Sequence, residues 1–247
     1  MTQTQQVALI TGGAGGIGSA VARRLAGQGW TVAIADVQDG PGLALATELG
    51  GAYHHLDVSD EAANRAVVAA VVEQYGGLDL AFLNAGVSTG TFPGPDFDPE
   101  LYRRAIGINL DGVVYGVVAA IPALRERGGG NIIATASLAG LTAVPFDPIY
   151  AANKHAVVGL VRGLGPAYAP EKIRVNALCP SFADTAILPG GREALEEAGV
   201  PVLTTDDVAD AVAAILDADG SGECWYVQYG RPSEPFVFRG VPGPIRD

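Results

Sequence analysis

The sequence predicts an α/β protein that folds as a single domain around one doubly wound parallel sheet. Short apolar runs of strand length alternate with longer segments of helical periodicity along the 247 residues, and this alternation is typical of right-handed βαβ units. Hydrophobic residues make up 49% of the chain and charged residues only 17%, which suits strands buried on both faces. Because no repeat period or linker-like segment interrupts the pattern, residues 1–247 are expected to form one domain.

The expected strands are short runs rich in apolar residues. In chain order they are Val7–Thr11, Thr31–Ala35, Ala52–Leu56, Leu78–Leu83, Asn131–Thr135, Arg174–Leu178 and Cys224–Gln228. The expected helices between them are Gly16–Gln28, Pro41–Leu49, a helix opening at Ser59-Asp60-Glu61, a long helical region from Pro99 to Leu124, Tyr150–Tyr168 and Asp206–Leu216. Ile17, Val21 and Leu25 stand at a spacing of four in the first helix, and Ser59-Asp60-Glu61 supplies a cap and an acidic first turn.

The formal net charge of −12 argues against nucleic acid and membranes as partners, because an acidic surface repels phosphate. The longest apolar stretch, Gly112–Leu124, is shorter than the roughly 20 residues that span a bilayer. The first residues, MTQTQQVALITGG, carry no secretory signal, so a cytoplasmic location is expected. Cys179 and Cys224 lack metal-ligand spacing and are expected to be free thiols, and no metal site is predicted.

The residues that follow the expected strands are mostly glycine or polar. They are Gly12–Gly18, Asp36, Asp57, Asn84–Gly86, Ser137 and Pro180–Thr185. Ligands of doubly wound sheets bind beyond the carboxyl ends of the strands. The sequence therefore predicts a cofactor site at this edge.

The glycine-rich segment from Gly12 to Gly18 follows the first strand and opens the first helix. Glycine allows the backbone to approach a ligand closely, and a helix N-terminus offers free N–H groups to a pyrophosphate. Two dinucleotide-loop patterns fit, one with Gly12, Gly16 and Gly18 and the other with Gly12, Gly15 and Gly18. A plain strand-to-helix turn is the alternative to both.

Asp36 ends the second strand, 18 positions after Gly18. A carboxylate at this place can accept hydrogen bonds from both hydroxyls of an adenosine ribose and would repel a 2′-phosphate. No arginine or lysine in the glycine loop or directly after Asp36 offsets that repulsion. Asp36 therefore favours NAD over NADP, and the alternative is an aspartate that caps the next loop.

Tyr150 and Lys154 stand four residues apart in the segment YAANK, so a helix would place them on one face. With the glycine loop, the Asn84-Ala85-Gly86 triplet and Ser137, in this order and spacing, they make the chain resemble the short-chain dehydrogenase/reductase family over almost its whole length. The likeness is to the compact members with one Rossmann-like domain.

The resemblance implies an NAD site in which the loop pattern is that of Gly12, Gly16 and Gly18. Asp57-Val58 would hold the adenine, Asn84-Ala85-Gly86 the adenosine ribose, and Pro180 with the Ser181–Thr185 loop the nicotinamide carboxamide. The implied cofactor-binding residues are Gly12, Gly16, Ile17, Gly18, Asp36, Asp57, Val58, Asn84, Ala85, Gly86, Tyr150, Lys154, Pro180 and Thr185.

The resemblance also implies a catalytic set, consisting of Asn109, Ser137, Tyr150 and Lys154. A free tyrosine has a pKa near 10, and both a neighbouring ammonium and a positive nicotinamide favour its phenolate. Tyr150 would exchange a proton with the substrate oxygen, to which Ser137 would hydrogen-bond. Lys154 would also bind the nicotinamide ribose, and Asn109 would hold a water that connects Lys154 to solvent.

Two residues depart from the family pattern, since Asn153 stands where serine is common and Ser181 where glycine is usual. The substrate site is expected to have an apolar wall of Leu138, Leu141, Val144 and Phe146, to which Ser88, Phe92, Phe182, Ile187 and Leu188 add. A neutral, largely hydrophobic secondary alcohol or ketone is the expected substrate.

A lid is expected at 180–201. A tail at 231–247 would pack on its own core or on a neighbouring subunit, and the resemblance implies a homodimer or homotetramer with the Tyr150–Tyr168 helix at an interface.

Three functions remain open. An NAD-dependent alcohol dehydrogenase or carbonyl reductase fits all the motifs. An NADPH-dependent ketoreductase acting on carrier-bound acyl chains is disfavoured by Asp36. A non-catalytic dinucleotide-binding sensor would not need Tyr150 and Lys154, yet both are present.

Overall fold

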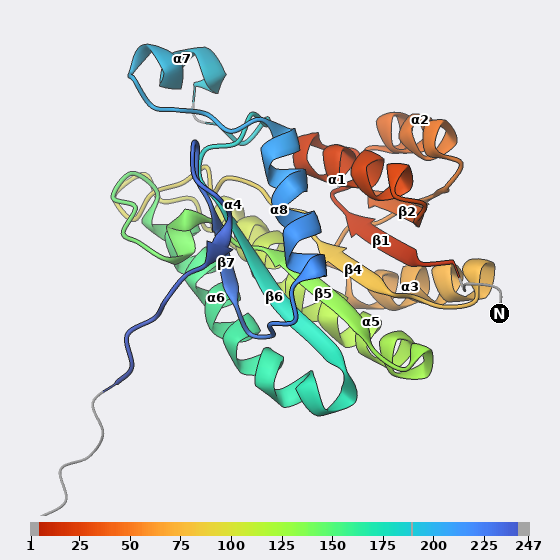
Figure 1. The fold of residues 1–247 in the computed structure, drawn as a ribbon. Helices are drawn as coiled ribbons and strands as arrows, with labels where there is room; N and C mark the ends of the chain where they lie inside the picture. The colour runs from red at the N-terminus through yellow and green to blue at the C-terminus, as the bar shows by residue number, and fades with distance from the viewer. Residues whose placement is uncertain (1–4, 189, 242–247) are drawn as a thin grey trace, which may run out of the picture.

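The computed structural model describes residues 5–188 and 190–241. One sheet of eight strands, in the order β3-β2-β1-β4-β5-β6-β7-β8, runs through them (Figure 1). The strands are β1 (Val7–Thr11), β2 (Thr31–Asp36), β3 (Ala52–His55), β4 (Leu80–Leu83), β5 (Gly130–Thr135), β6 (Ile173–Pro180), β7 (Cys224–Val227) and β8 (Glu234–Pro235). The seven predicted strands are all present, and they pair in parallel from β3 to β7.

The sheet is not parallel throughout. Glu234–Pro235, in the predicted tail, forms the short strand β8, which pairs antiparallel with β7 through Trp225 and Tyr226. Its two-residue length and its proline suit an edge, where one side of the strand needs no partner. The predicted doubly wound parallel sheet is therefore confirmed, with one short antiparallel strand added at its edge.

The helices fill the connections between the strands. They are α1 (Gly16–Gly27), α2 (Asp39–Leu49), α3 (Glu61–Tyr75), α4 (Pro99–Ile106), α5 (Gly112–Arg127), α6 (Pro148–Tyr168), α7 (Gly191–Glu197) and α8 (Thr205–Asp217). Short 3₁₀ turns lie at Leu138–Gly140 and Ala169–Glu171, and a π-helical turn, Gly107–Asp111, joins α4 to α5. The predicted helices agree with these bounds to within a few residues at each end.

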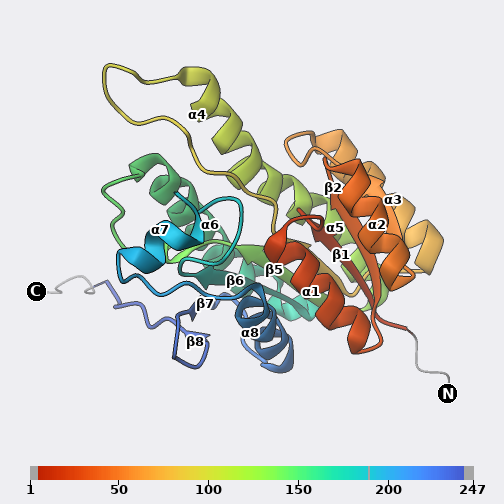
Figure 2. The ribbon, with the colours of Figure 1, turned by 90° about the horizontal axis from the view of Figure 1, so that it is seen from above.

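Two helical layers enclose the sheet, as Figure 2 shows from above. The first core cluster joins one face of the sheet to α3, α5 and α6, and the second joins the other face to α1, α2 and α8. Nearly every residue of β1, β2, β4 and β6 is buried, as expected of a sheet covered on both sides.

The run Pro99–Arg127 is long and apolar enough to cross a membrane by length and composition alone. Half of its most apolar window is buried within the fold, and α5 contributes Val113, Val117 and Leu124 to the core beside α3. This run is therefore a core helix of an α/β fold.

The strand order reverses between β1 and β4, because the chain builds the sheet outward from β1 in one direction and from β4 in the other. Such a switch point opens a crevice at the carboxyl ends of the strands. The predicted cofactor-binding residues lie at or just after strand ends at this edge, except Tyr150 and Lys154, which lie on α6.

Candidate active site

The glycine loop folds so tightly that a Cβ at Gly12, Gly13 or Gly18 would come within 3.0 Å of main-chain atoms. Gly12 has φ of +61°, and a Cβ there would lie 2.8 Å from the Ala85 Cα. A Cβ on Gly18 would lie 2.2 Å from the Gly12 carbonyl oxygen, and one on Gly16 only 3.1 Å from the Thr185 methyl group. At Gly15 the nearest atom would be at an ordinary 3.5 Å. Close contacts thus constrain Gly12, Gly13, Gly16 and Gly18 and leave Gly15 unconstrained, so the constrained positions include the three glycines of the pattern that the family resemblance favours.

Helix α1 begins at Gly16 without a side-chain cap, because its N-cap residue is Gly15. Its first N–H groups therefore face the carboxyl edge of the sheet without a side-chain acceptor. A helix N-terminus of this kind favours an anion such as a pyrophosphate.

Asp36 lies beside the glycine loop and is only 6% exposed. Its Oδ2 accepts a hydrogen bond from the Ala14 N–H at 3.0 Å, and its Oδ1 accepts one from the Gln38 N–H at 3.0 Å. Each carboxylate oxygen has a further lone pair, so the residue is held in place and can still accept hydrogen bonds from a ligand.

The residues after β3 divide between surface and core. Asp57 is exposed, and its Oδ1 accepts hydrogen bonds from the Ser59 N–H and hydroxyl at 2.9 and 2.7 Å. Val58 is buried against α5, where a Cβ on Gly112 would approach its Cγ2 to 2.7 Å. The Val58 side chain thus packs in the core, and Asp57 is the polar group of the pair at the surface.

Asn84 connects three strand ends. Its N–H donates to the Thr11 Oγ1 at 2.9 Å, and its Oδ1 accepts from the Thr135 Oγ1 at 3.1 Å. Two residues on, a Cβ on Gly86 would lie 3.3 Å from the Asn109 Oδ1 and 3.6 Å from the Lys154 Nζ. The Asn84–Gly86 segment therefore lies directly against the predicted catalytic residues.

Asn109 lies in the π-helical turn and is fully buried. Its Oδ1 accepts the Val87 N–H at 2.8 Å and its Nδ2 donates to the Val87 carbonyl at 2.9 Å. The side-chain amide thus holds the segment after β4 in place, with both of its polar atoms engaged.

Tyr150 and Lys154 lie one turn apart on α6, with the Lys154 Nζ 5.6 Å from the centre of the Tyr150 ring. Burial raises the pKa of Tyr150, and a hydrogen bond with the Ser137 hydroxyl acts in the opposite direction. Burial lowers the pKa of Lys154 to about 8. The phenol, ammonium and hydroxyl are therefore close neighbours, and two of them have pKa values shifted by their surroundings, as is common at active sites.

The predicted nicotinamide loop begins where β6 ends. Ser137 donates a long hydrogen bond, 3.5 Å, to the Pro180 carbonyl, and its Oγ accepts the Ala139 N–H at 3.1 Å. Ala183 forms a β-bridge with Leu203, so the two ends of the segment between them lie side by side. Helix α7, which belongs to this segment, stands away from the rest of the protein (Figure 1).

Three supporting residues were not foreseen. Thr11 accepts the Asn84 N–H, and the Thr135 carbonyl accepts a hydrogen bond from the Lys154 Nζ at 2.8 Å. The Asp147 side chain caps α6 by accepting the Tyr150 N–H at 2.9 Å. Only Asp147 has a sequence signal, since an acidic residue before a proline marks a helix start.

Comparison with known proteins identifies the family. The family model described as short chain dehydrogenase matches residues 6–196. The chain belongs to the short-chain dehydrogenase family. It is 39% identical over 183 residues to 2,5-dichloro-2,5-cyclohexadiene-1,4-diol dehydrogenase of Sphingobium indicum, covering 73% of each chain. It is 36% identical over 232 residues to 3beta-hydroxysteroid dehydrogenase 2 of Eggerthella lenta, covering 88% of this chain and 89% of the relative.

Solved structures agree with this assignment. The fold is similar to that of 3-ketoacyl-(acyl-carrier-protein) reductase from Brucella melitensis complexed with NADH, with a TM-score of 0.85, 30% identity, and coverage of 92% of this chain and 98% of that one. It is also similar to a variant of actinorhodin polyketide ketoreductase with NADPH, with a TM-score of 0.83, 30% identity, and coverage of 92% and 97%. The protein is an oxidoreductase of the short-chain dehydrogenase family, whose fold binds a nicotinamide dinucleotide.

The side chains of this short-chain dehydrogenase fit such a cofactor. The glycine loop leaves room only for backbone at three positions. Within residues 5–188 and 190–241, the buried Lys154 ammonium has a single hydrogen-bond acceptor, the Thr135 carbonyl, although it carries three donors. Ribose hydroxyls would accept from the others. In the same residues, no group of three or more His, Cys, Asp or Glu side chains is placed to hold a metal ion.

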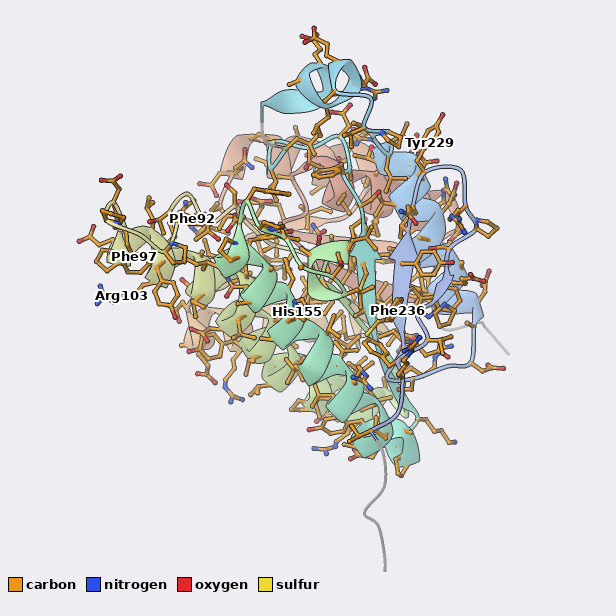
Figure 3. All side chains as sticks on the ribbon, turned by 90° about the vertical axis from the view of Figure 1, so that its left-hand side faces the viewer. Phe92, Phe97, Arg103, His155, Tyr229 and Phe236 are labelled. Carbon is orange, nitrogen blue, oxygen red and sulfur yellow. The ribbon has the colours of Figure 1, made fainter. Side chains whose placement is uncertain are left out.

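The predicted substrate-lining residues are partly exposed. Phe146 is 64% and Phe92 53% exposed, and Figure 3 shows Phe92 on the segment before α4. His155 lies on the side of α6 that faces away from the sheet, as the same figure shows, and its Nδ1 is 2.9 Å from the Ala151 carbonyl oxygen. It therefore takes no part in the site.

Proposed function

We propose that this short-chain dehydrogenase interconverts a neutral, largely hydrophobic secondary alcohol and its ketone, with NAD(H) as cofactor. The observation that carries the proposal is the arrangement of Tyr150, Lys154 and Ser137 beside Gly86, at the carboxyl edge of a sheet that carries a glycine loop. A phenol, an ammonium and a hydroxyl in this arrangement can hold an alcohol oxygen and move its proton.

Proton transfer is the task of Tyr150. Bound NAD⁺ supplies the acceptor for the hydride that leaves the alcohol carbon. Tyr150 takes the hydroxyl proton as phenolate and returns it when a ketone is reduced, while Ser137 hydrogen-bonds the same oxygen. Because burial raises the pKa of Tyr150, its phenolate depends on the neighbouring Lys154 charge for stabilisation.

Lys154 and Asn109 support this step in different ways. Lys154 is held by the Thr135 carbonyl and offers its remaining N–H groups to the nicotinamide ribose. The Asn109 side-chain amide forms both of its hydrogen bonds with the Val87 backbone. We therefore propose that this amide positions Gly86 and Val87 beside Lys154 and does not itself bind a water.

The choice of NAD is supported by Asp36. A 2′-phosphate would bring further negative charge against a buried carboxylate that cannot turn away, because two backbone N–H groups hold it. The similar structures contain NADH in one case and NADPH in the other. Family membership therefore does not decide between the two cofactors, and the residues at the adenosine end must do so. Asp57 would complete the adenosine site from the end of β3, and Pro180 and Thr185 the nicotinamide end.

A cyclic alcohol is the substrate class that we favour. Two relatives are named for the oxidation of ring alcohols, a cyclohexadienediol and a steroid. The apolar side chains of Phe92, Phe146 and Ile187 stand exposed on segments that flank the site, and they suit a hydrocarbon ring better than a charged group.

Several further features remain predictions. The segment 180–201 would act as the lid over the substrate. Of the tail 231–247, Phe238 packs on this chain's own core, with Arg162 3.8 Å above its ring, and residues 242–247 lie outside the described part. A homo-oligomer built on the outer face of α6, and a cytoplasmic location, also remain predictions.

The proposal is tested with a panel of cyclic and open-chain alcohols and ketones, assayed by nicotinamide absorbance with NAD(H) and with NADP(H). We expect turnover with NAD(H) and hydrophobic secondary alcohols. A clear preference for NADPH together with activity on acyl-thioester ketones would instead establish a synthetic ketoreductase.

Tyr150→Phe is expected to lower kcat by at least about a hundredfold, in line with the loss of a general acid–base group, while NADH binding changes little. NADH binding is followed by fluorescence titration, which needs no turnover. Unchanged kcat in this variant would exclude the proposed proton transfer.

A further inference from the structure

The turn between β2 and α2 has an unusual anchor. Helix α2 begins at Asp39, and the N-cap residue Gln38 makes no side-chain hydrogen bond to it. The Asp39 carboxylate reaches instead to the neighbouring strand β3. Its Oδ1 lies 2.7 Å from the Tyr53 hydroxyl and 2.7 Å from the His55 Nδ1.

Tyr53 links this anchor to Asp36. Its hydroxyl also lies 2.7 Å from the main-chain carbonyl oxygen of Asp36, so one phenol proton is shared between two acceptors. Burial and the bond to Asp39 raise the pKa of Tyr53, and the same bond lowers the pKa of Asp39. Tyr53 therefore remains a donor and Asp39 a carboxylate throughout the neutral pH range.

The Tyr53 ring is fixed as firmly as its hydroxyl. It packs against α2 at Gly42, where a Cβ would come within 2.2 Å of the ring Cε2. In the sheet, Tyr53 pairs with Ile34 and His55 pairs with Asp36, so both side chains project from the strand beside β2, toward the same face. The turn from Asp36 to Asp39 is thus held, on the side that faces β3, by the side chains of Tyr53 and His55.

We propose that Asp39 is a specificity-determining residue for the adenosine end of the cofactor, with Tyr53 and His55 as its positioning residues. The inference rests on the proposed use of NAD. Asp39 would act in two ways. It fixes the turn that carries Asp36, and it places a second negative charge beside that turn, which disfavours a 2′-phosphate.

The test compares Asp39→Asn with Glu48→Gln. Asp39→Asn keeps the shape of the side chain and its ability to accept hydrogen bonds, but it removes the charge. Glu48→Gln removes the same charge from the last turn of the same helix, where Glu48 pairs with Arg23. For each variant, the Kd values of NADH and NADPH are measured by fluorescence titration, and kcat and KM are measured with NAD and NADP.

We expect Asp39→Asn to shift the ratio of kcat/KM for NADP over NAD upward by about three- to tenfold, the size of effect that removal of one charge in a partly aqueous site can produce. The shift should lie in KM and Kd, with kcat nearly unchanged. If Asp39→Asn and Glu48→Gln have the same ratio of kcat/KM for NADP over NAD, the inference is overturned.

Tyr53→Phe tests the positioning role, since the ring still fills the space against Gly42 while the hydroxyl is lost. We expect weaker binding of NADH by about three- to tenfold with kcat unchanged, as for the loss of one well-placed hydrogen bond. Wild-type NADH affinity in this variant would remove Tyr53 from the proposal.

The outcomes also separate this inference from the proposed function. A wild-type protein that prefers NADPH overturns the proposed use of NAD itself. A wild-type protein that prefers NADH, with an Asp39→Asn variant that discriminates equally well, overturns only the role of Asp39.

Discussion

Burial makes Lys154 a functional residue at the expense of stability. The lysine is fully buried, and burial lowers its pKa from 10.5 to about 8. Because the folded pKa is below the unfolded one, the unfolded chain binds more protons between these values, and the free energy of unfolding rises with pH across this window. Below about pH 8 the lysine is charged in both states, and its unfavourable contribution is present in full.

Replacement of Lys154 by a hydrophobic residue of similar length should therefore stabilise the fold while it abolishes turnover. For Lys154→Met we expect a gain of about 1–3 kcal/mol at pH 7, the scale set by 1.36 kcal/mol per pKa unit, reduced by the unpaired Thr135 carbonyl. The gain should shrink as pH rises from 8 to above 10. Urea unfolding across this pH range measures it, and a loss of stability at pH 7 would show that the buried ammonium is already well compensated.

Helix α6 presents Tyr150 from its first turn, so the start of the helix and the chemistry are coupled at the level of the element. Asp147 caps α6 through the Tyr150 N–H, and its charge also raises the pKa of Tyr150. Asp147→Asn should keep the cap and remove the charge, which lowers the pKa of Tyr150. The rise of alcohol oxidation with pH should then move to lower pH. An unmoved pH–rate profile would show that Asp147 acts only as a cap.

Asp147→Ala removes the cap as well. We expect a loss of about 0.5–2 kcal/mol in the free energy of unfolding, together with a fall in kcat, because the Tyr150 backbone is no longer fixed. Asp98→Ala is the matched control, since Asp98 caps α4 by accepting the Glu100 and Leu101 N–H groups. If both variants lose stability and kcat equally, the cap of α6 has no special part in catalysis.

The elements that the sequence predicted well are those with a local signal. The strands follow from apolar runs, and the tight glycines of the first loop from their spacing. The π-helical turn has no such signal, because it forms around contacts between Asn109 and Val87, 22 residues apart. Strand β8 depends on the register of Trp225 with Pro235, and the anchor of Asp39 depends on a tyrosine from the next strand. These features arise from tertiary contacts, which periodicity does not report.

At the scale of the whole molecule, the outer side of α6 carries several small residues, beside the exposed side chains of His155 and Arg162. Ala152, Gly159 and Gly163 are exposed there, and a Cβ on either glycine would meet no atom within 4 Å. On α5, Val118 is 40% exposed. Small residues on a helix allow close approach of another helix, and exposed apolar residues favour association, so this face suits the predicted contact between two copies.

Gly159→Gln tests that contact. In a monomer the substitution should be neutral or stabilising by up to about 1 kcal/mol, because glycine is a poor helix former. Across an interface it would hold the helices apart and weaken assembly. Gly27→Gln on α1 is the control, since Gly27 is also exposed, also helical and also open to a Cβ. Light scattering over a range of concentrations should show a smaller assembly for Gly159→Gln alone. An assembly unchanged by Gly159→Gln would place the subunit interface on another face.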